Sequence, residues 1–254
     1  MRLLLDLGNT RLKWALAEPA SQAWVAQGAV DWQDDVAAAL ASAWAGMALP
    51  VEVVAASVVA SARETELAAI VFRLLGAAPL WMRTPASACG VINAYPEPQR
   101  LGVDRFLALL AAYADQRAPC VVVNVGTALT LDALTADGLH LGGLIAPSPA
   151  LMQQALSTAA ARVPLTREGT VVELADNTAD AVASGCWQAA VALVERFAMR
   201  MTDRLGGAPS LILGGGDAER LASLLSVPAH VSSDAVLRGL ALWATTQLPP
   251  PQLT

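Results

Sequence analysis

The chain has 254 residues, of which 55% are hydrophobic and 15% are charged, and this composition excludes a disordered protein. Its length fits one large domain or two small ones. The 22 acidic and 16 basic residues give a net charge of −6, which argues against a duplex nucleic-acid binder because such proteins need a basic surface. We therefore expect a folded protein without a nucleic-acid partner.

Neither a membrane span nor a disulfide framework is expected. The most apolar stretch, residues 36–62, is mostly alanine and is interrupted by Pro50 and Glu52, and no run of about 18 strongly apolar residues occurs. Asp6 follows only three leucines, which is too short an apolar segment for a signal peptide. Three dispersed cysteines are too few for a disulfide framework or a zinc site. We expect a cytoplasmic protein.

In chain order, the first part of the sequence begins with three strands and then changes to a helical pattern. Strands are expected at 2–7, 11–17, 23–30, 51–57 and 80–83, and helices at 31–44, 61–75 and 102–116. Asp31 is the expected N-cap of the first helix, and Gly76 ends the second. Residues 84–99, rich in proline and small residues, are expected to form a loop, and loops of this length are usually functional or disordered.

The pattern then starts again. Strands are expected at 120–125, 128–134, 139–145 and 210–213 with a short one near Ala229, and helices at 149–161 and 178–205, after Gly216 and from Ser233. Prolines at 249–251 are expected to end the folded part. The two histidines, His140 and His230, lie far apart without ligand spacing, so both are expected to be structural or exposed.

Two segments of the sequence resemble one another at a separation of 118 residues. Residues 3–10 (LLLDLGNT) and 121–127 (VVVNVGT) both have an apolar strand, a short polar residue, an apolar residue, a glycine and a hydroxyl residue. Each is followed by two more strands and then by helices. The repeat predicts a tandem duplication, with similar domains at 1–117 and 118–254 that face one another across a cleft.

The first of these turns has the chemistry of a phosphate site. Asp6 would place a carboxylate at the rim of a sheet, Gly8 would let the backbone approach a ligand, and Thr10 would add a hydroxyl beside exposed amides. A single turn of this kind is more often an ordinary hairpin, but two copies favour phosphate binding. Lys13, the one lysine of the chain, could reach a nucleotide phosphate or could be a solvated strand residue.

A second pair of residues has the chemistry of phosphoryl transfer. Asp104 is expected in the first turn of a helix, where it could accept the proton of an attacking hydroxyl group. Arg105 beside it could bind a substrate carboxylate in a bidentate manner. The alternative is a helix-capping aspartate followed by a surface arginine.

These turns resemble those of the acetate and sugar kinase, heat-shock and actin superfamily. The segment Gly214–Gly216 is similar to the turn that this superfamily places against adenosine, although it could be a plain strand-to-helix turn. Four ordered segments narrow the resemblance to type III pantothenate kinase: residues 6–13 (DLGNTRLK), 93–105 (NAYPEPQRLGVDR), 126–132 (GTALTLD) and 142–147 (GGLIAP). Ser148 departs from that pattern because glycine is usual there.

The resemblance implies an α/β fold of two ribonuclease-H-like domains in tandem with ATP in the cleft between them. It implies ATP- and Mg²⁺-dependent phosphorylation of pantothenate to 4′-phosphopantothenate, with Asp104 as general base and Asp6 near the magnesium ion, in contact through water. The implied ATP-binding residues are Asp6, Leu7, Gly8, Asn9, Thr10, Arg11, Leu12, Lys13 and Thr127. The implied pantothenate-binding residues are Tyr95, Gly102, Val103, Asp104, Arg105 and Thr178.

Two further implications concern a partner chain and a monovalent cation. Thr178 matches a threonine that reaches pantothenate from the neighbouring subunit, which implies a homodimer; capping the following helix is its other expected role. Asn124 stands where the family commonly has an aspartate ligand for K⁺ or NH₄⁺, so a site here would rest on a neutral amide oxygen.

Two other functions remain open at this point. The first is a regulatory protein that kept the fold and acts by contacting other proteins, which the presence of Asp6, Lys13, Asp104 and Arg105 disfavours. The second is a related sugar kinase or phosphatase, which the segment from Tyr95 to Arg105 disfavours.

Overall fold

The protein forms two compact units, and the chain returns to the first unit after completing the second. The computed structural model describes residues 1–18, 23–47, 50, 52–159 and 168–247. Met1–Asp115 and the segment from Asp234 onward form the first unit, and Gln116–Ser233 form the second. Parts of three expected features lie outside the described residues: the start of the strand at 51–57, the end of the helix at 149–161, and the prolines at 249–251.

The first unit is built on a five-stranded mixed sheet with the order β3-β2-β1-β4-β5. Its strands are β1 (Arg2–Leu7), β2 (Arg11–Ala17), β3 (Trp24–Asp31), β4 (Glu52–Ser57) and β5 (Leu80–Trp81). The first three are antiparallel neighbours, whereas β4 and β5 run parallel to β1. All six residues of β1 are buried, as is typical of a central strand that is covered on both faces.

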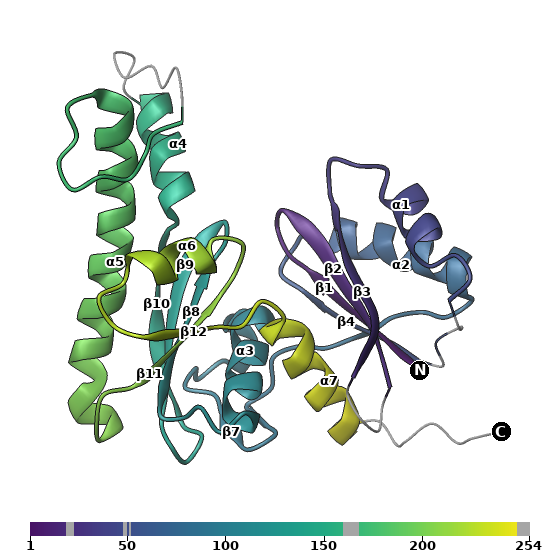
Figure 1. Cartoon of the computed structure of the whole chain (residues 1–254). Coiled ribbons are helices and arrows are strands. Elements are labelled where there is room, and N and C mark those ends of the chain that lie inside the picture. The colour runs from purple at the N-terminus through teal and green to yellow at the C-terminus, as the bar shows by residue number, and fades with distance from the viewer. Residues whose placement is uncertain (19–22, 48–49, 51, 160–167, 248–254) are drawn as a thin grey trace. The chain divides into compact units, whose positions relative to one another are not determined.

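Helices cover both faces of this sheet (Figure 1). The helices are α1 (Val36–Ala43), α2 (Ser61–Leu75), α3 (Val103–Ala114) and α7 (Ala235–Gln247). Leu3, Leu5 and Leu7 share one core cluster with residues of α1 and α2. Side chains alternate along a strand, so Leu4 and Asp6 point to the opposite face, where α7 contacts β1 and both α3 and α7 contact β4. This alternation places Asp6 on the same side of the sheet as α3.

The second unit repeats the strand order of the first, with β10-β9-β8-β11-β12 and the same pattern of antiparallel and parallel neighbours. Its strands are β8 (Cys120–Val125), β9 (Ala128–Leu134), β10 (His140–Pro147), β11 (Ser210–Gly214) and β12 (Ala229–Val231), and its helices are α4 (Pro149–Ala159), α5 (Thr178–Leu205) and α6 (Ala218–Leu224). Helices α5 and α6 contribute to the core cluster on one face. The shared strand order agrees with the repeat that the sequence shows.

The last helix departs from the predicted division of the chain. The predicted boundary after residue 117 lies close to the observed division at Asp115/Gln116, but α7, expected in the second domain, packs in the first unit against α3. The packing is close at Gly239, where an added Cβ would lie 2.0 Å from the Leu107 carbonyl oxygen. Arg238 also forms an ion pair with Asp115 at the end of α3.

Two local expectations are corrected. Helix α1 begins five residues after Asp31, because Asp35 is its N-cap and accepts a hydrogen bond from the Ala38 amide at 3.0 Å. The expected loop at 84–99 contains a small hairpin, β6 (Ser87–Ala88) and β7 (Val91–Ile92), and its end forms part of a 3₁₀ turn over Pro98–Arg100. Among the described residues, no helix is both long enough and apolar enough to cross a bilayer.

Candidate active site

The first expected phosphate turn joins β1 to β2. The Gly8 amide donates to the Arg11 carbonyl at 3.1 Å, and the side chains of Asn9, Thr10 and Arg11 are exposed. Leu7 and Leu12, on either side of the turn, are fully buried in the core. Only their backbone groups can therefore serve a ligand.

A residue that the sequence did not single out closes this turn. The indole Nε1 of Trp32 donates a hydrogen bond to the Gly8 carbonyl at 2.7 Å, and the Trp32 amide donates to the Thr10 carbonyl at 3.3 Å. Trp32 lies 24 residues from Gly8, and no short-range pattern links the two.

Asp6 is a buried carboxylate among other charges. It pairs with Lys13 in the register of β1 and β2 and is 9% exposed. Burial raises the pKa of Asp6 from 3.8 to about 7; the charge of Asp104 contributes to this rise, and that of Lys13 opposes it. Asp6, Lys13 and Asp104 therefore lie close enough to interact electrostatically, although they are far apart in sequence.

Asp104 lies in the first turn of α3, as predicted, but it is not the cap of the helix. Gly102 occupies the N-cap position, and the Asp104 carboxylate accepts a hydrogen bond from the Arg105 amide at 2.8 Å. A Cβ at Gly102 would lie 2.6 Å from the Asp104 carboxylate oxygen, so a side chain there would displace the carboxylate. Asp104 is therefore not the N-cap residue of α3.

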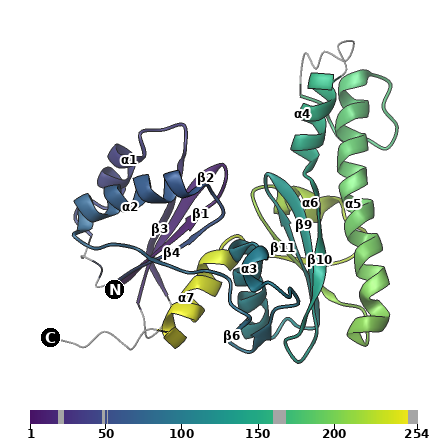
Figure 2. The same ribbon diagram turned by 180° about the vertical axis from the view of Figure 1, so that it is seen from behind.

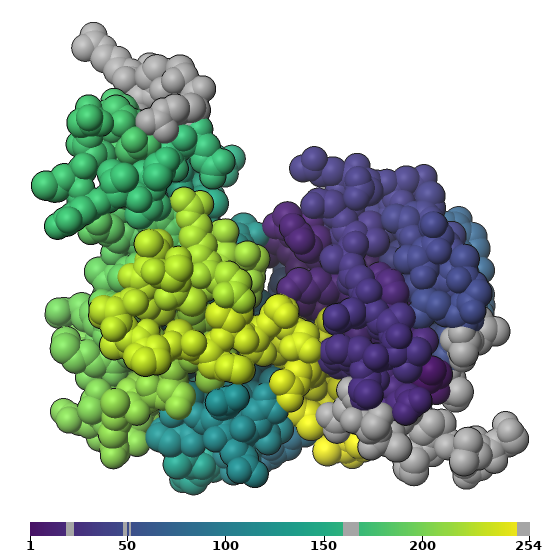
Figure 3. Space-filling view, in the orientation of Figure 1, coloured from purple at the N-terminus to yellow at the C-terminus, as the bar shows by residue number. Residues whose placement is uncertain are grey.

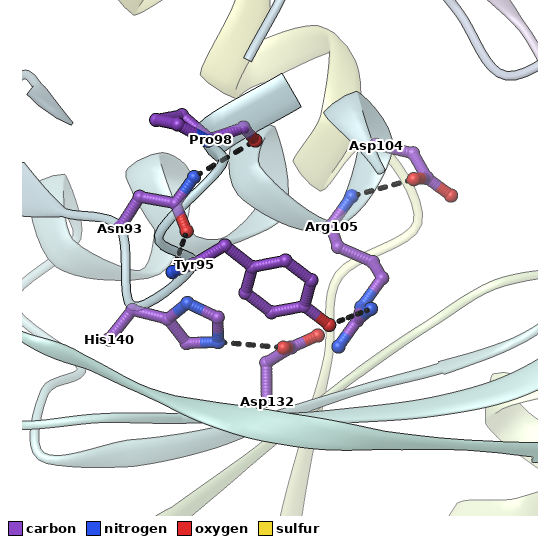
Figure 4. A network of polar contacts seen from close by, with 7 residues as sticks. All are labelled: Asn93, Tyr95, Pro98, Asp104, Arg105, Asp132 and His140. Atoms are coloured by element: carbon purple, nitrogen blue, oxygen red, sulfur yellow. Dashed lines mark hydrogen bonds and ion pairs between the residues drawn. The ribbon is translucent and has the colours of Figure 1, made fainter. Parts of the chain in front are cut away.

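Arg105 and Tyr95 contact one another beside Asp104 (Figure 4). The Arg105 guanidinium donates to the Tyr95 hydroxyl at 3.3 Å, and Arg105 is only 7% exposed. Val103 is also buried, so it can offer a ligand little besides its backbone. A buried guanidinium next to a phenol suits a carboxylate-bearing substrate.

Two further residues hold the segment that carries these groups. Asn93 accepts from the Tyr95 amide at 3.0 Å and donates to the carbonyls of Pro85 and Pro98 at 3.3 and 3.2 Å. The buried hydroxyl of Thr84 donates to the Leu101 carbonyl at 2.8 Å, just before α3. Asn93 belongs to a motif noticed in the sequence, whereas no sequence signal pointed to Thr84.

The equivalent turn of the second unit joins β8 to β9 and contains Thr127, whose side chain is exposed. Asn124 pairs with Thr130 in the register of these strands, and its side-chain oxygen lies 3.4 Å from where a Cβ would stand on Gly214. Gly215 has a φ of +95°, and its Cβ would lie 2.2 Å from the Val125 carbonyl oxygen, so this position requires glycine. The glycine segment therefore packs closely against the end of β8.

The two histidines of the second unit have different surroundings. His140 Nε2 lies 2.8 Å from the Asp132 carboxylate, and both side chains are buried (Figure 4). His230 is exposed on β12. The described residues contain no cluster of three or more His, Cys, Asp or Glu side chains suited to a metal ion.

Thr178 is the first residue of α5, and it borders an apolar groove. Asn177 rather than Thr178 caps the helix, with its side chain accepting from the Asp180 amide at 3.1 Å. Helices α4 and α5 lie side by side and extend beyond the second sheet (Figure 2), and the green atoms of this projection are seen in Figure 3. The groove between them has a volume of about 1220 Å³, and its lining includes Leu151, Met152, Leu156, Thr178, Val182 and Cys186.

The chain is similar to known proteins over nearly its whole length. The profile of the type III pantothenate kinase family matches residues 2–200. A type III pantothenate kinase of Aromatoleum aromaticum is 41% identical over 245 residues, covering 96% of this chain and 98% of the relative. A type III pantothenate kinase of Xanthomonas campestris pv. campestris is 43% identical over 251 residues, covering 97% and 98%.

Solved structures share the fold at low sequence identity. A putative Baf family transcriptional activator from Campylobacter jejuni has a TM-score of 0.62 at 18% identity and covers 96% of this chain and 98% of that chain. A putative 2-dehydro-3-deoxygalactonokinase from Sinorhizobium meliloti has a TM-score of 0.62 at 11% identity and covers 98% and 100%. These likenesses show the fold alone, and they confirm the predicted class of two ribonuclease-H-like units in tandem.

Proposed function

The chain belongs to the type III pantothenate kinase family and phosphorylates pantothenate with ATP, the first step of coenzyme A synthesis, and we propose that Asp104 is the general base of this reaction. The observation that carries the proposal is the position of Asp104 in the first turn of α3, where its charge acts on Asp6 at the first phosphate turn. A base for this transfer must stand beside the phosphates.

The proposed reaction is a direct in-line transfer. The pantothenate hydroxyl oxygen forms a bond to the γ-phosphorus of ATP while the bond from that phosphorus to the β,γ-bridging oxygen breaks, and ADP leaves. Asp104 accepts the hydroxyl proton. Arg105 binds the pantothenate carboxylate, Tyr95 contacts the substrate beside it, and Gly102 and Val103 contribute backbone. The Tyr95–Arg105 hydrogen bond supports this grouping.

ATP is assigned to the backbone of residues 6–13 and to Thr127. Exposed amides and hydroxyls at Asn9, Thr10 and Thr127 can donate to phosphate oxygens, and Lys13 adds a positive charge. The equivalent position of the two turns in two sheets of the same strand order supports a shared role.

The residues around Asp6 fit a magnesium ion. A buried carboxylate whose pKa is raised beside a second carboxylate favours a divalent cation, because the cation stabilises the ionised forms. Asp6 would hold Mg²⁺ through water, and the bound ion would supply positive charge next to the phosphates. Asn124 offers only a neutral oxygen to K⁺ or NH₄⁺, so we expect a weak dependence of turnover on these ions.

The active form is proposed to be a cytoplasmic homodimer in which Thr178 reaches the pantothenate of the neighbouring subunit. Its support is the large apolar groove beside Thr178 and the exposure of Leu151 and Leu156 within it. The alternative of a regulatory protein without kinase activity gains no support from the relatives.

The experiment that tests the assignment is a coupled ADP-release assay with pantothenate, ATP and magnesium, repeated with potassium, ammonium and sodium. The variant Asp104→Asn should lower kcat by two orders of magnitude or more while the affinity for ATP, measured by calorimetry, stays within about threefold of wild type. Wild-type turnover in this variant would show that Asp104 is not the base.

A further inference from the structure

The first phosphate turn needs an external support. Gly8 has no side chain, and the side chains of Asn9 and Thr10 are exposed, so core packing does not hold the turn. A glycine peptide can adopt several orientations at little cost. A turn that receives phosphates must nevertheless present its amide groups in one orientation before the ligand arrives.

Trp32 supplies two contacts that select one orientation. Its indole N–H holds the Gly8 carbonyl at 2.7 Å, and its amide holds the Thr10 carbonyl at 3.3 Å. The peptide unit between Gly8 and Asn9 is planar and trans, so its C=O and N–H groups point in opposite directions. Binding the carbonyl to the indole therefore aims the Asn9 amide away from Trp32.

The contacts of Trp32 show that it is more than a core side chain. Its ring is partly exposed and borders a cavity of about 210 Å³, so packing alone does not dictate its position. The Arg63 guanidinium, from the first turn of α2, lies 4.7 Å from the centre of the ring. This cation–π contact restrains the indole in the orientation that reaches Gly8.

We propose that Trp32 is a positioning residue for ATP, which holds the Gly8–Asn9 peptide so that the Asn9 amide faces the nucleotide phosphates, with Arg63 holding the ring. The inference rests on the proposed binding of ATP by residues 6–13. It predicts that loss of the indole N–H weakens the use of ATP and leaves the use of pantothenate unchanged.

The test compares two tryptophan variants of the full chain. Trp32→Phe keeps an aromatic ring but removes the donor, and Trp44→Phe makes the same change at an indole nitrogen that is buried without a hydrogen-bond partner among the described residues. We expect Trp32→Phe to lower kcat/KM for ATP roughly threefold to tenfold and to weaken ATP binding in calorimetry by a similar factor. The KM for pantothenate should stay within about twofold, and Trp44→Phe should change none of these values.

Three results would overturn the proposal: equal effects of both variants on ATP, an equal rise in both KM values for Trp32→Phe, or unchanged ATP binding in that variant. If Trp32→Phe does not fold, the variant Arg63→Met tests the proposal instead, because it leaves the indole of Trp32 in place. Its kcat/KM for ATP should fall roughly twofold to fivefold, and an unchanged value contradicts the proposal.

The variant Thr10→Ala separates this inference from the function on which it rests. If Thr10→Ala weakens ATP binding and Trp32→Phe does not, the turn binds ATP and the role of Trp32 is wrong. If Thr10→Ala also leaves ATP binding unchanged, the assignment of the turn to ATP has failed. Absence of pantothenate-dependent turnover in the wild-type protein would contradict the proposed function itself.

Discussion

At the scale of single residues, the burial of Asp6 couples the catalytic site to stability. The folded protein retains the Asp6 proton up to about pH 7, whereas an unfolded chain loses it near the ordinary value of 3.8. Unfolding therefore releases a proton between these values, and the free energy of unfolding falls as the pH rises from about 4 to about 7. Above pH 7 the buried Asp6 is ionised, and this lowers the free energy of unfolding of the ligand-free protein by an amount on the order of 4 kcal/mol.

This penalty predicts a variant that is inactive but more stable. Asp6→Asn keeps the shape of the protonated side chain and carries no charge, so its melting temperature at pH 8 should exceed that of wild type by several degrees. At pH 4 the two proteins should have the same melting temperature. Asp137→Asn is the control, because Asp137 is fully exposed and its hydrogen bond from Thr135 lowers its pKa. A lower melting temperature of Asp6→Asn at pH 8 would contradict the argument.

At the scale of elements, the contact between α3 and α7 supports the helix that carries Asp104. Replacement of Gly239 by alanine brings two opposing effects. Alanine improves helix propensity by up to about 1 kcal/mol. Its Cβ would however lie 2.0 Å from a backbone oxygen of α3, which cannot rotate away. Separating the helices costs more, so Gly239→Ala should lower the free energy of unfolding by about 2 kcal/mol in urea titration. An unchanged or raised value would show that the two helices are not packed closely there.

Most elements could be predicted from the sequence because their signals are local. β1 and β8 are short apolar runs between turns, and Gly76 and Gly206 end helices in the left-handed conformation that favours glycine. The start of α1 was misplaced because Asp31 and Asp35 are both good caps in sequence, and only the structure shows which of them accepts a hydrogen bond.

The catalytic motifs were also visible in the sequence, but their supports were not. Asp6 and Asp104 lie in recognisable segments, whereas the contacts of Trp32 and Thr84 join residues 24 and 17 positions apart. A tryptophan next to a strand and a threonine after one have many ordinary roles. Only the folded chain brings them to the Gly8 and Leu101 carbonyls, and only the folded chain brings Gly239 of α7 against α3.

At the scale of the whole molecule, the apolar groove beside Thr178 predicts dependence of activity on assembly. Leu156→Glu would place a charge in the groove, so the protein should become monomeric in light scattering and lose pantothenate-dependent turnover. Phe72→Glu, at an exposed phenylalanine on α2 outside the groove, should change neither property. A dimeric and active Leu156→Glu protein would contradict the proposed role of this surface.

The return of the chain to its first unit also orders events during synthesis. A ribosome completes residues 116–233, all of the second unit, before it makes α7. Most of the first unit emerges from the ribosome early. It cannot complete its fold, however, until α7 is translated, after the whole second unit. The unit made second can thus become native first, the reverse of the usual order in which multidomain chains fold.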